Sequence, residues 1–197
     1  MAVPRVNLFA VPGPVIVEQL HAIAEALRRE TGIVAFALQG KPVHCTLYMT
    51  KYDETRIDEL RARFRALPRS RALLATARLR RTAASWLFLD LEKSAELTAL
   101  ARATALSLCD LREPAQAPPF WMIDEAQRAA FAQFGSPSAG AAFEPHLTLA
   151  AGVEETTLGG FVERSPLPRV EDQIAALGLA IVDEDGQIET PLDEMPW

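Results

Sequence analysis

The sequence predicts an α+β fold in a single domain that spans residues 1–197. The main observation is that strand and helix patterns are mixed without the regularity of a βαβ series. No Gly-rich phosphate loop of the Walker or dinucleotide type is present, and a short histidine motif occurs twice. A chain of this length buries about 70% of its unfolded surface, so a core can form without a metal ion or a disulfide.

The expected elements follow from hydrophobic spacing and turn residues. The first helix, at 14–31, carries aliphatic residues at helical spacing from Ile16 to Leu27, and Gly32 follows as a stop signal. Strands are expected at 5–11, 33–38, 43–50, 71–80, 85–92, 146–151, 174–182 and 187–190. Further helices are expected at 57–67, 97–108, 121–134 and 155–164, with a Pro-rich break at 112–120.

Composition is that of a globular protein in water, with 49% hydrophobic residues, 23% charged residues and no apolar run long enough to span a membrane. The N-terminus lacks the pattern of a secretory signal, and Cys45 and Cys109 form no disulfide framework. We therefore expect a cytoplasmic monomer that does not bind membranes.

The net charge of −6 argues against sequence-independent binding to nucleic acid. Charge is unevenly distributed, because residues 51–81 carry ten basic side chains against four acidic ones. That segment either offers a local site for a small anion or forms a solvated helix face.

The repeated motif places a histidine and a threonine on one face of each of two strands. "VHCTLYMT" begins at Val43 and "EPHLTLA" begins at Glu144, so that both contain His-x-Thr-Leu. Side chains alternate along a strand, which puts His44, Thr46 and Tyr48 opposite an apolar face and pairs His146 with Thr148 in the same way. Each strand can therefore present an imidazole and a hydroxyl, about 7 Å apart, to one phosphate.

"PVHCTLYMT" and "FEPHLTLA" resemble the signature of the 2H phosphoesterase superfamily, which includes the LigT-like RNA 2′,3′-cyclic phosphodiesterases, also called 2′-5′ RNA ligases. The resemblance extends to the order of elements over most of the chain. It implies a bilobal, pseudo-symmetric fold in which two antiparallel sheets with outer helices face each other across a central cleft. It also implies that no metal or other cofactor takes part.

The chemistry of the four motif residues fits hydrolysis of a 2′,3′-cyclic phosphate. One histidine would take a proton from water and the other would protonate the departing ribose oxygen, while Thr46 and Thr148 would hold the non-bridging oxygens. The sequence does not decide whether His44 or His146 is the acid. A zinc hydrolase is disfavoured because the chain has no His-x-His or His-x-x-x-His spacing.

Residues expected to contact the substrate, besides the four motif residues, are Tyr48, Arg78, Arg80, Trp86 and Phe143. The arginines could meet a phosphate, and Trp86 could stack on a base or pack under a helix. Phe143 could shape the pocket or cap the core.

Two departures from the family pattern disfavour a polymeric RNA substrate. The second motif continues as "LAAG" where RNA-processing members often have a basic residue, and the segment at 112–143 is long for a compact member. The expected substrate is a cyclic nucleotide, a short RNA end or another small cyclic phosphate. The alternatives are a non-catalytic nucleotide- or RNA-binding module and an RNA 2′-5′ ligase.

Overall fold

The computed structural model describes residues 4–69, 72–114, 116–119, 122, 124–158, 160–165 and 167–197. Its strands are β1 (Arg5–Pro12), β2 (Cys45–Lys51), β3 (Leu73–Arg81), β4 (Leu87–Leu91), β5 (His146–Ala150), β6 (Glu171–Val182) and β7 (Ile188–Pro196). Its α-helices are α1 (Pro14–Thr31), α2 (Ile57–Arg65), α3 (Ala95–Leu108), α4 (Glu125–Phe134), α5 (Glu155–Leu158) and α6 (Phe161–Arg164).

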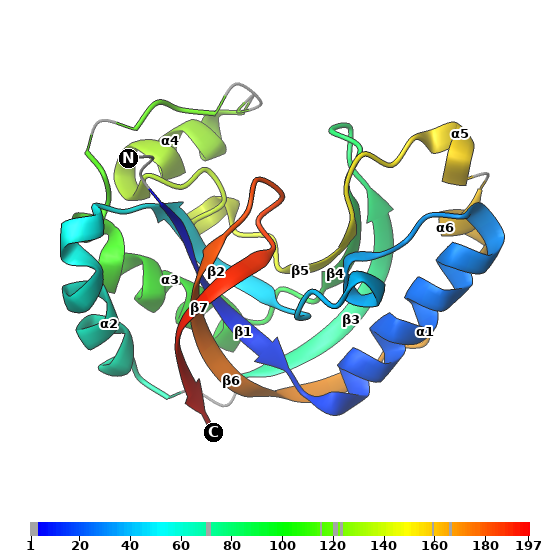
Figure 1. Cartoon of the computed structure of the whole chain (residues 1–197), viewed down its shortest axis with the longest axis horizontal. Coiled ribbons are helices and arrows are strands. Elements are labelled where there is room, and N and C mark those ends of the chain that lie inside the picture. The colour runs from blue at the N-terminus through cyan, green and yellow to red at the C-terminus, as the bar shows by residue number, and fades with distance from the viewer. Residues whose placement is uncertain are drawn as a thin grey trace.

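The strands form an antiparallel sheet in the order β1-β2-β5-β4-β3-β6-β7, and β1 also pairs with β6. The long strand β6 connects the two halves of the sheet, because its first residues pair with β3 and the rest pairs with β1 and β7. The halves β1–β2 and β3–β4–β5 therefore belong to one sheet that curves back on itself (Figure 1). The predicted α+β class is confirmed, and the two expected sheets are the halves of this one sheet, joined at β2–β5 and β3–β6.

Helices cover the outer sides of both halves. The helices α2, α3 and α4 lie on one side of the molecule, and α1, α5 and α6 lie on the other (Figure 1). In α1 the predicted aliphatic stripe is buried, and Gly32 ends the helix in the left-handed conformation with its N–H bonded to the Arg28 carbonyl. No helix in the described part of the chain is long and apolar enough to cross a membrane.

Several predicted elements differ from the structure. The strand expected at 33–38 is replaced by a 3₁₀ turn, η1 (Phe36–Gln39), which ends at Gly40 in the left-handed conformation. Left-handed Gly160 separates α5 from α6, where one helix at 155–164 was predicted. Parts of the segments predicted at 71–80, 112–120, 121–134 and 155–164 lie outside the described residues.

The apolar faces of β2 and β5 anchor the two motif strands. Cys45, Leu47, Leu147 and Leu149 are all essentially inaccessible to solvent and belong to the main core. α3 packs against β2 on this side. The opposite face of both strands is left to carry the polar residues of the motifs.

Candidate active site

The two motif strands lie side by side and run antiparallel. Cys45 of β2 pairs with Leu147 of β5, and both side chains point into the core. Continuing this register sets His44 opposite Thr148 and Thr46 opposite His146, all on the other face. The two histidines are therefore diagonal neighbours, about 7–8 Å apart. One phosphate can bridge that separation.

Both motifs contain a β-bulge at the leucine that follows the threonine. In the pairing of β1 with β2, Phe9 lies opposite Thr46 and Leu8 opposite Tyr48, so Leu47 is an extra residue. In the pairing of β4 with β5, Phe88 lies opposite Thr148 and Leu87 opposite Ala150, so Leu149 is extra in the same way. A bulge resets the alternation of side chains beyond it.

Because of this bulge, Tyr48 does not line the cleft as predicted. Its side chain is 1% exposed, and its hydroxyl donates to the Phe134 carbonyl at the end of α4. Burial raises the pKa of Tyr48, which keeps the phenol neutral. Thr50 donates to the Gly135 carbonyl over 2.7 Å, so the long segment at 112–143 is anchored on the outer side of β2.

Each histidine is oriented by a backbone carbonyl two residues before it. The Nδ1 atom of His44 lies 3.0 Å from the Pro42 carbonyl oxygen, and Nδ1 of His146 lies 2.8 Å from that of Glu144. A carbonyl only accepts, so Nδ1 carries the proton in the neutral ring. Nε2 is therefore the atom that each imidazole offers for proton transfer.

Burial lowers the pKa of both imidazoles below the ordinary value of 6.5. For His44, backbone groups of Pro42 and Gly186 and the charge of Asp183 oppose this effect. For His146, the Glu144 carbonyl and Asp90 oppose it, whereas Arg80 and His44 lower the pKa further. The two rings are therefore close enough to influence each other's charge.

An aromatic ring supports each histidine from the neighbouring strand. The ring of Phe9 meets His44 edge to face with centroids 5.3 Å apart, and Phe88 stacks on His146 at 4.0 Å. Sequence reasoning did not assign Phe9 and Phe88 to the site. The signal was an echo between "NLFAV" at 7–11 and "WLFLD" at 86–90.

Asn7 is a further residue that sequence reasoning missed. It is fully buried, and its Nδ2 atom donates to Thr46 Oγ1 over 2.9 Å. Since that oxygen already accepts from Asn7, the Thr46 hydroxyl hydrogen is free to point into the cleft. In the other half, the corresponding residue is Trp86, and among the described residues it makes no hydrogen bond to Thr148.

The two predicted arginines lie on the His146 side. Arg80 forms a two-point ion pair with Asp90 at 2.7 and 2.9 Å and stands over the ring of Phe88. Arg78 is 72% exposed on its side chain and donates to the same carboxylate. Both line a hollow of about 300 Å³, together with Lys93 and Glu144 among others.

Trp86 and Phe143 have different surroundings. Trp86 is half-buried and tilted against Phe88 with centroids 6.2 Å apart, next to the layer that supports His146. Phe143 is 3% exposed and packs in the core, so it does not contact a ligand as predicted.

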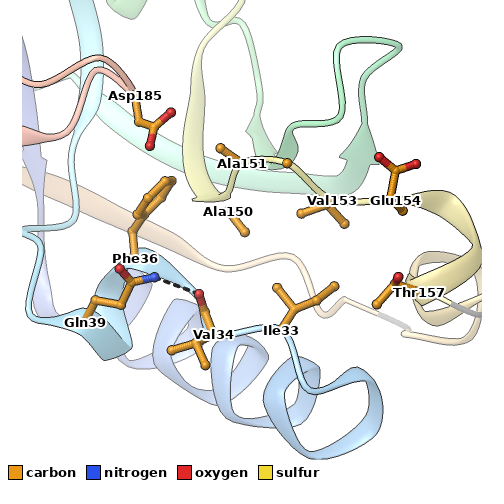
Figure 2. A pocket seen from close by; sticks show the side chains of 11 residues that line it. Ile33, Val34, Phe36, Gln39, Ala150, Ala151, Val153, Glu154, Thr157 and Asp185 are labelled. Carbon is orange, nitrogen blue, oxygen red and sulfur yellow. Dashed lines mark hydrogen bonds between the residues drawn. The ribbon is translucent and has the colours of Figure 1, made fainter.

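A larger hollow, of about 420 Å³, is shown in Figure 2. Ala150, two residues beyond Thr148, forms part of its wall, and Asp185 precedes the Gly186 backbone that reaches His44. The other lining residues are Ile33, Val34, Phe36, Gln39, Ala151, Gly152, Val153, Glu154 and Thr157. The two hollows lie toward opposite ends of β5, and among the described residues neither is lined by a histidine.

Other reactive groups do not converge here. Cys45 is fully buried, and burial raises the pKa of its thiol to about 12, so it remains a core residue. The described residues contain no group of three or more His, Cys, Asp or Glu side chains that could hold a metal ion.

No family model and no curated protein matches the sequence. Solved structures do match over the whole chain. A crystal structure of a phosphoesterase has a TM-score of 0.61 at 16% identity, covering 99% of this chain and 98% of the other. E. coli LigT complexed with 3′-AMP has a TM-score of 0.58 at 14% identity, with 98% and 97% covered. A Thermus thermophilus protein has a TM-score of 0.57 at 18% identity, with the same coverage. The fold of this chain is that of LigT and related phosphoesterases, as its resemblance to the 2H phosphoesterases implied.

Proposed function

We propose that the chain is a metal-independent phosphoesterase that hydrolyses a 2′,3′-cyclic phosphate by two-histidine acid–base catalysis. The observation that carries the proposal is the pair of imidazoles on adjacent antiparallel strands, each with Nδ1 held by a carbonyl and Nε2 left for chemistry. This arrangement suits a reaction in which one proton is taken and another is given across a single phosphorus atom.

In the proposed reaction, Nε2 of one neutral imidazole accepts a proton from water as its oxygen attacks phosphorus. The bond from phosphorus to one ribose oxygen breaks, and Nε2 of the second, protonated imidazole gives that oxygen its proton. The product is a nucleoside monophosphate. A proton exchange with solvent then restores both rings.

Thr46 and Thr148 donate to the non-bridging oxygens and stabilise the charge that develops on them. Asn7 supports this role on one side, because it occupies the acceptor lone pair of Thr46 and leaves the hydroxyl hydrogen for the phosphate. Phe9 and Phe88 restrict the imidazole rings to the orientations in which Nε2 faces the substrate.

A nucleotide is the substrate that the surroundings favour. Arg78, Arg80 and Lys93 line the hollow beside His146 and supply charge for a further phosphate group. LigT of E. coli has been crystallised with 3′-AMP, ATP and NADP⁺, which supports nucleotide binding by a chain of this fold. The substrate class proposed is therefore a cyclic nucleotide or a short RNA end.

The test is hydrolysis of the four nucleoside 2′,3′-cyclic monophosphates in the presence of EDTA. His44→Ala and His146→Ala should each abolish turnover, whereas His21→Ala, which removes an exposed histidine of α1, should not change it. Identical rates in all three variants would show that the histidine pair is not the catalyst. The position of the product phosphate, 2′ or 3′, then reports which ribose oxygen leaves.

A further inference from the structure

The larger hollow beside His44 differs in character from the one beside His146. Its lining includes two carboxylates, Asp185 and Glu154, and no lysine or arginine. In the described part of the chain, neither carboxylate makes a hydrogen bond or an ion pair. The hollow beside His146 also contains two carboxylates, Asp90 and Glu144, but sets three basic side chains against them, so a second phosphate is expected at that end.

The shape and remaining walls of the hollow suit a flat, uncharged ring. The volume of about 420 Å³ falls within the range of small-molecule sites, about 300–1,000 Å³. Half-buried Phe36 forms one wall, and Ala150 and Val153 face it across the hollow (Figure 2). Gln39 donates its amide to the Val34 carbonyl, which leaves its oxygen as an acceptor.

Asp185 is held in place by the turn between β6 and β7. Oδ1 of Asp183 accepts from the backbone N–H groups of Asp185 and Gln187 at 3.0 and 2.8 Å. Lys41 fixes the other oxygen of Asp183 at 2.9 Å, and Gly186 closes the turn in the left-handed conformation. The carboxylate of Asp185 is thus presented beside Phe36 by a pre-organised loop (Figure 2).

We propose that this hollow is a nucleobase subsite in which Phe36 stacks on the base and Asp185 selects guanine. The inference rests on the proposed function, since the cyclic phosphate must lie between the imidazoles for its base to reach Phe36. Guanine offers two adjacent donors, N1–H and N2–H, to a carboxylate. Adenine, cytosine and uracil each place an acceptor next to their donor, which the carboxylate repels.

The experiment compares kcat/KM for the four 2′,3′-cyclic nucleotides in the native protein, Asp185→Asn and Glu184→Gln. Glu184 lies in the same turn but does not line the hollow, so its variant controls for the loss of one negative charge. The native protein should prefer the guanosine substrate, and Asp185→Asn should reduce kcat/KM for that substrate alone by about 5- to 150-fold. Phe36→Leu should lower kcat/KM for all four substrates.

Equal kcat/KM for the four bases in the native protein, or an equal loss for all of them in Asp185→Asn, would overturn the subsite. If no cyclic nucleotide is hydrolysed, calorimetry of 2′-GMP and 2′-UMP binding tests the subsite separately. Tighter binding of 2′-GMP that is lost in Asp185→Asn supports the subsite while the proposed reaction fails. Indistinguishable binding rejects the subsite as well.

Discussion

The two halves of the site share their backbone design and differ in their side chains. Both present His-x-Thr-Leu with a bulge at the leucine, a carbonyl on Nδ1 and a phenylalanine against the imidazole. Around this common frame, one half carries Asn7 where the other carries Trp86. The carboxylate that acts on His146 is Asp90 on the partner strand, whereas the one that acts on His44 is Asp183 at the end of β6. The common frame sets where the two Nε2 atoms lie, whereas the residues that differ set the surroundings of each imidazole.

The largest effect is expected from substituting the histidines, one in each half of the site. His44→Gln and His146→Gln should each lower kcat by about 10²–10⁴-fold, because each removes one proton-transfer group. The double variant should lose little more than either single variant, since the two groups act in one transition state. Steady-state kinetics test this, and fully additive losses would contradict a concerted pair.

Substituting the threonines should have the next largest effect on kcat. Only Thr46 has a buried asparagine, Asn7, beside its hydroxyl, so the two halves should respond differently. Thr46→Val and Thr148→Val should each lower kcat by about 10²–10³-fold through loss of a donor to the charged oxygens. Asn7→Leu should lower kcat by about 10-fold or less, which corresponds to the loss of one hydrogen bond. It should have no further effect on kcat when Thr46→Val is already present.

Trp86→Leu is the matched control, because Trp86 occupies the corresponding position in the other half. Any effect of Trp86→Leu on kcat should be the same whether or not Thr148→Val is present. A loss from Asn7→Leu that also persists in the Thr46→Val background would mean that Asn7 does not act through Thr46.

The pH profile should distinguish the two imidazoles. The rate falls below the pKa of the base and above the pKa of the acid, and burial lowers the pKa of both histidines, so the active window lies at lower pH than for free imidazole. Asp90→Asn removes a charge that favours protonated His146 and should move one limb of the profile to lower pH. Arg80→Gln should move the same limb to higher pH. Shifts in the same direction for both variants would contradict the assignment of that limb to His146.

The smallest expected effect is on stability and concerns Tyr48. Tyr48→Phe leaves the Phe134 carbonyl without its donor and should lower the free energy of unfolding by about 1–3 kcal/mol. Because the ring lies behind the sheet, kcat/KM should not change. Denaturant titration and steady-state kinetics measure the two quantities, and a lost activity at unchanged stability would place Tyr48 in the site after all.

The sequence was sufficient to predict the fold class and the common face of the four motif residues. Alternation along a strand is local, and the apolar residues Cys45 and Leu147 are enough to orient it. Beyond Thr46 the prediction failed, because a bulge depends on the partner strand and moves Tyr48 to the outer side. Asn7 was not recognisable either, since its partner lies 39 residues away on the next strand.

The pairing of Cys45 with Leu147 makes the separation of the imidazoles a property of the main chain. Neighbouring strands lie about 4.8 Å apart whatever side chains they carry. Residues around the two strands can therefore differ without changing this spacing, and the neighbours that share the fold are only 14–18% identical to this chain. A bulkier residue in place of Cys45 would push against the core side of β2 and β5 and change the separation of the imidazoles, without touching either histidine.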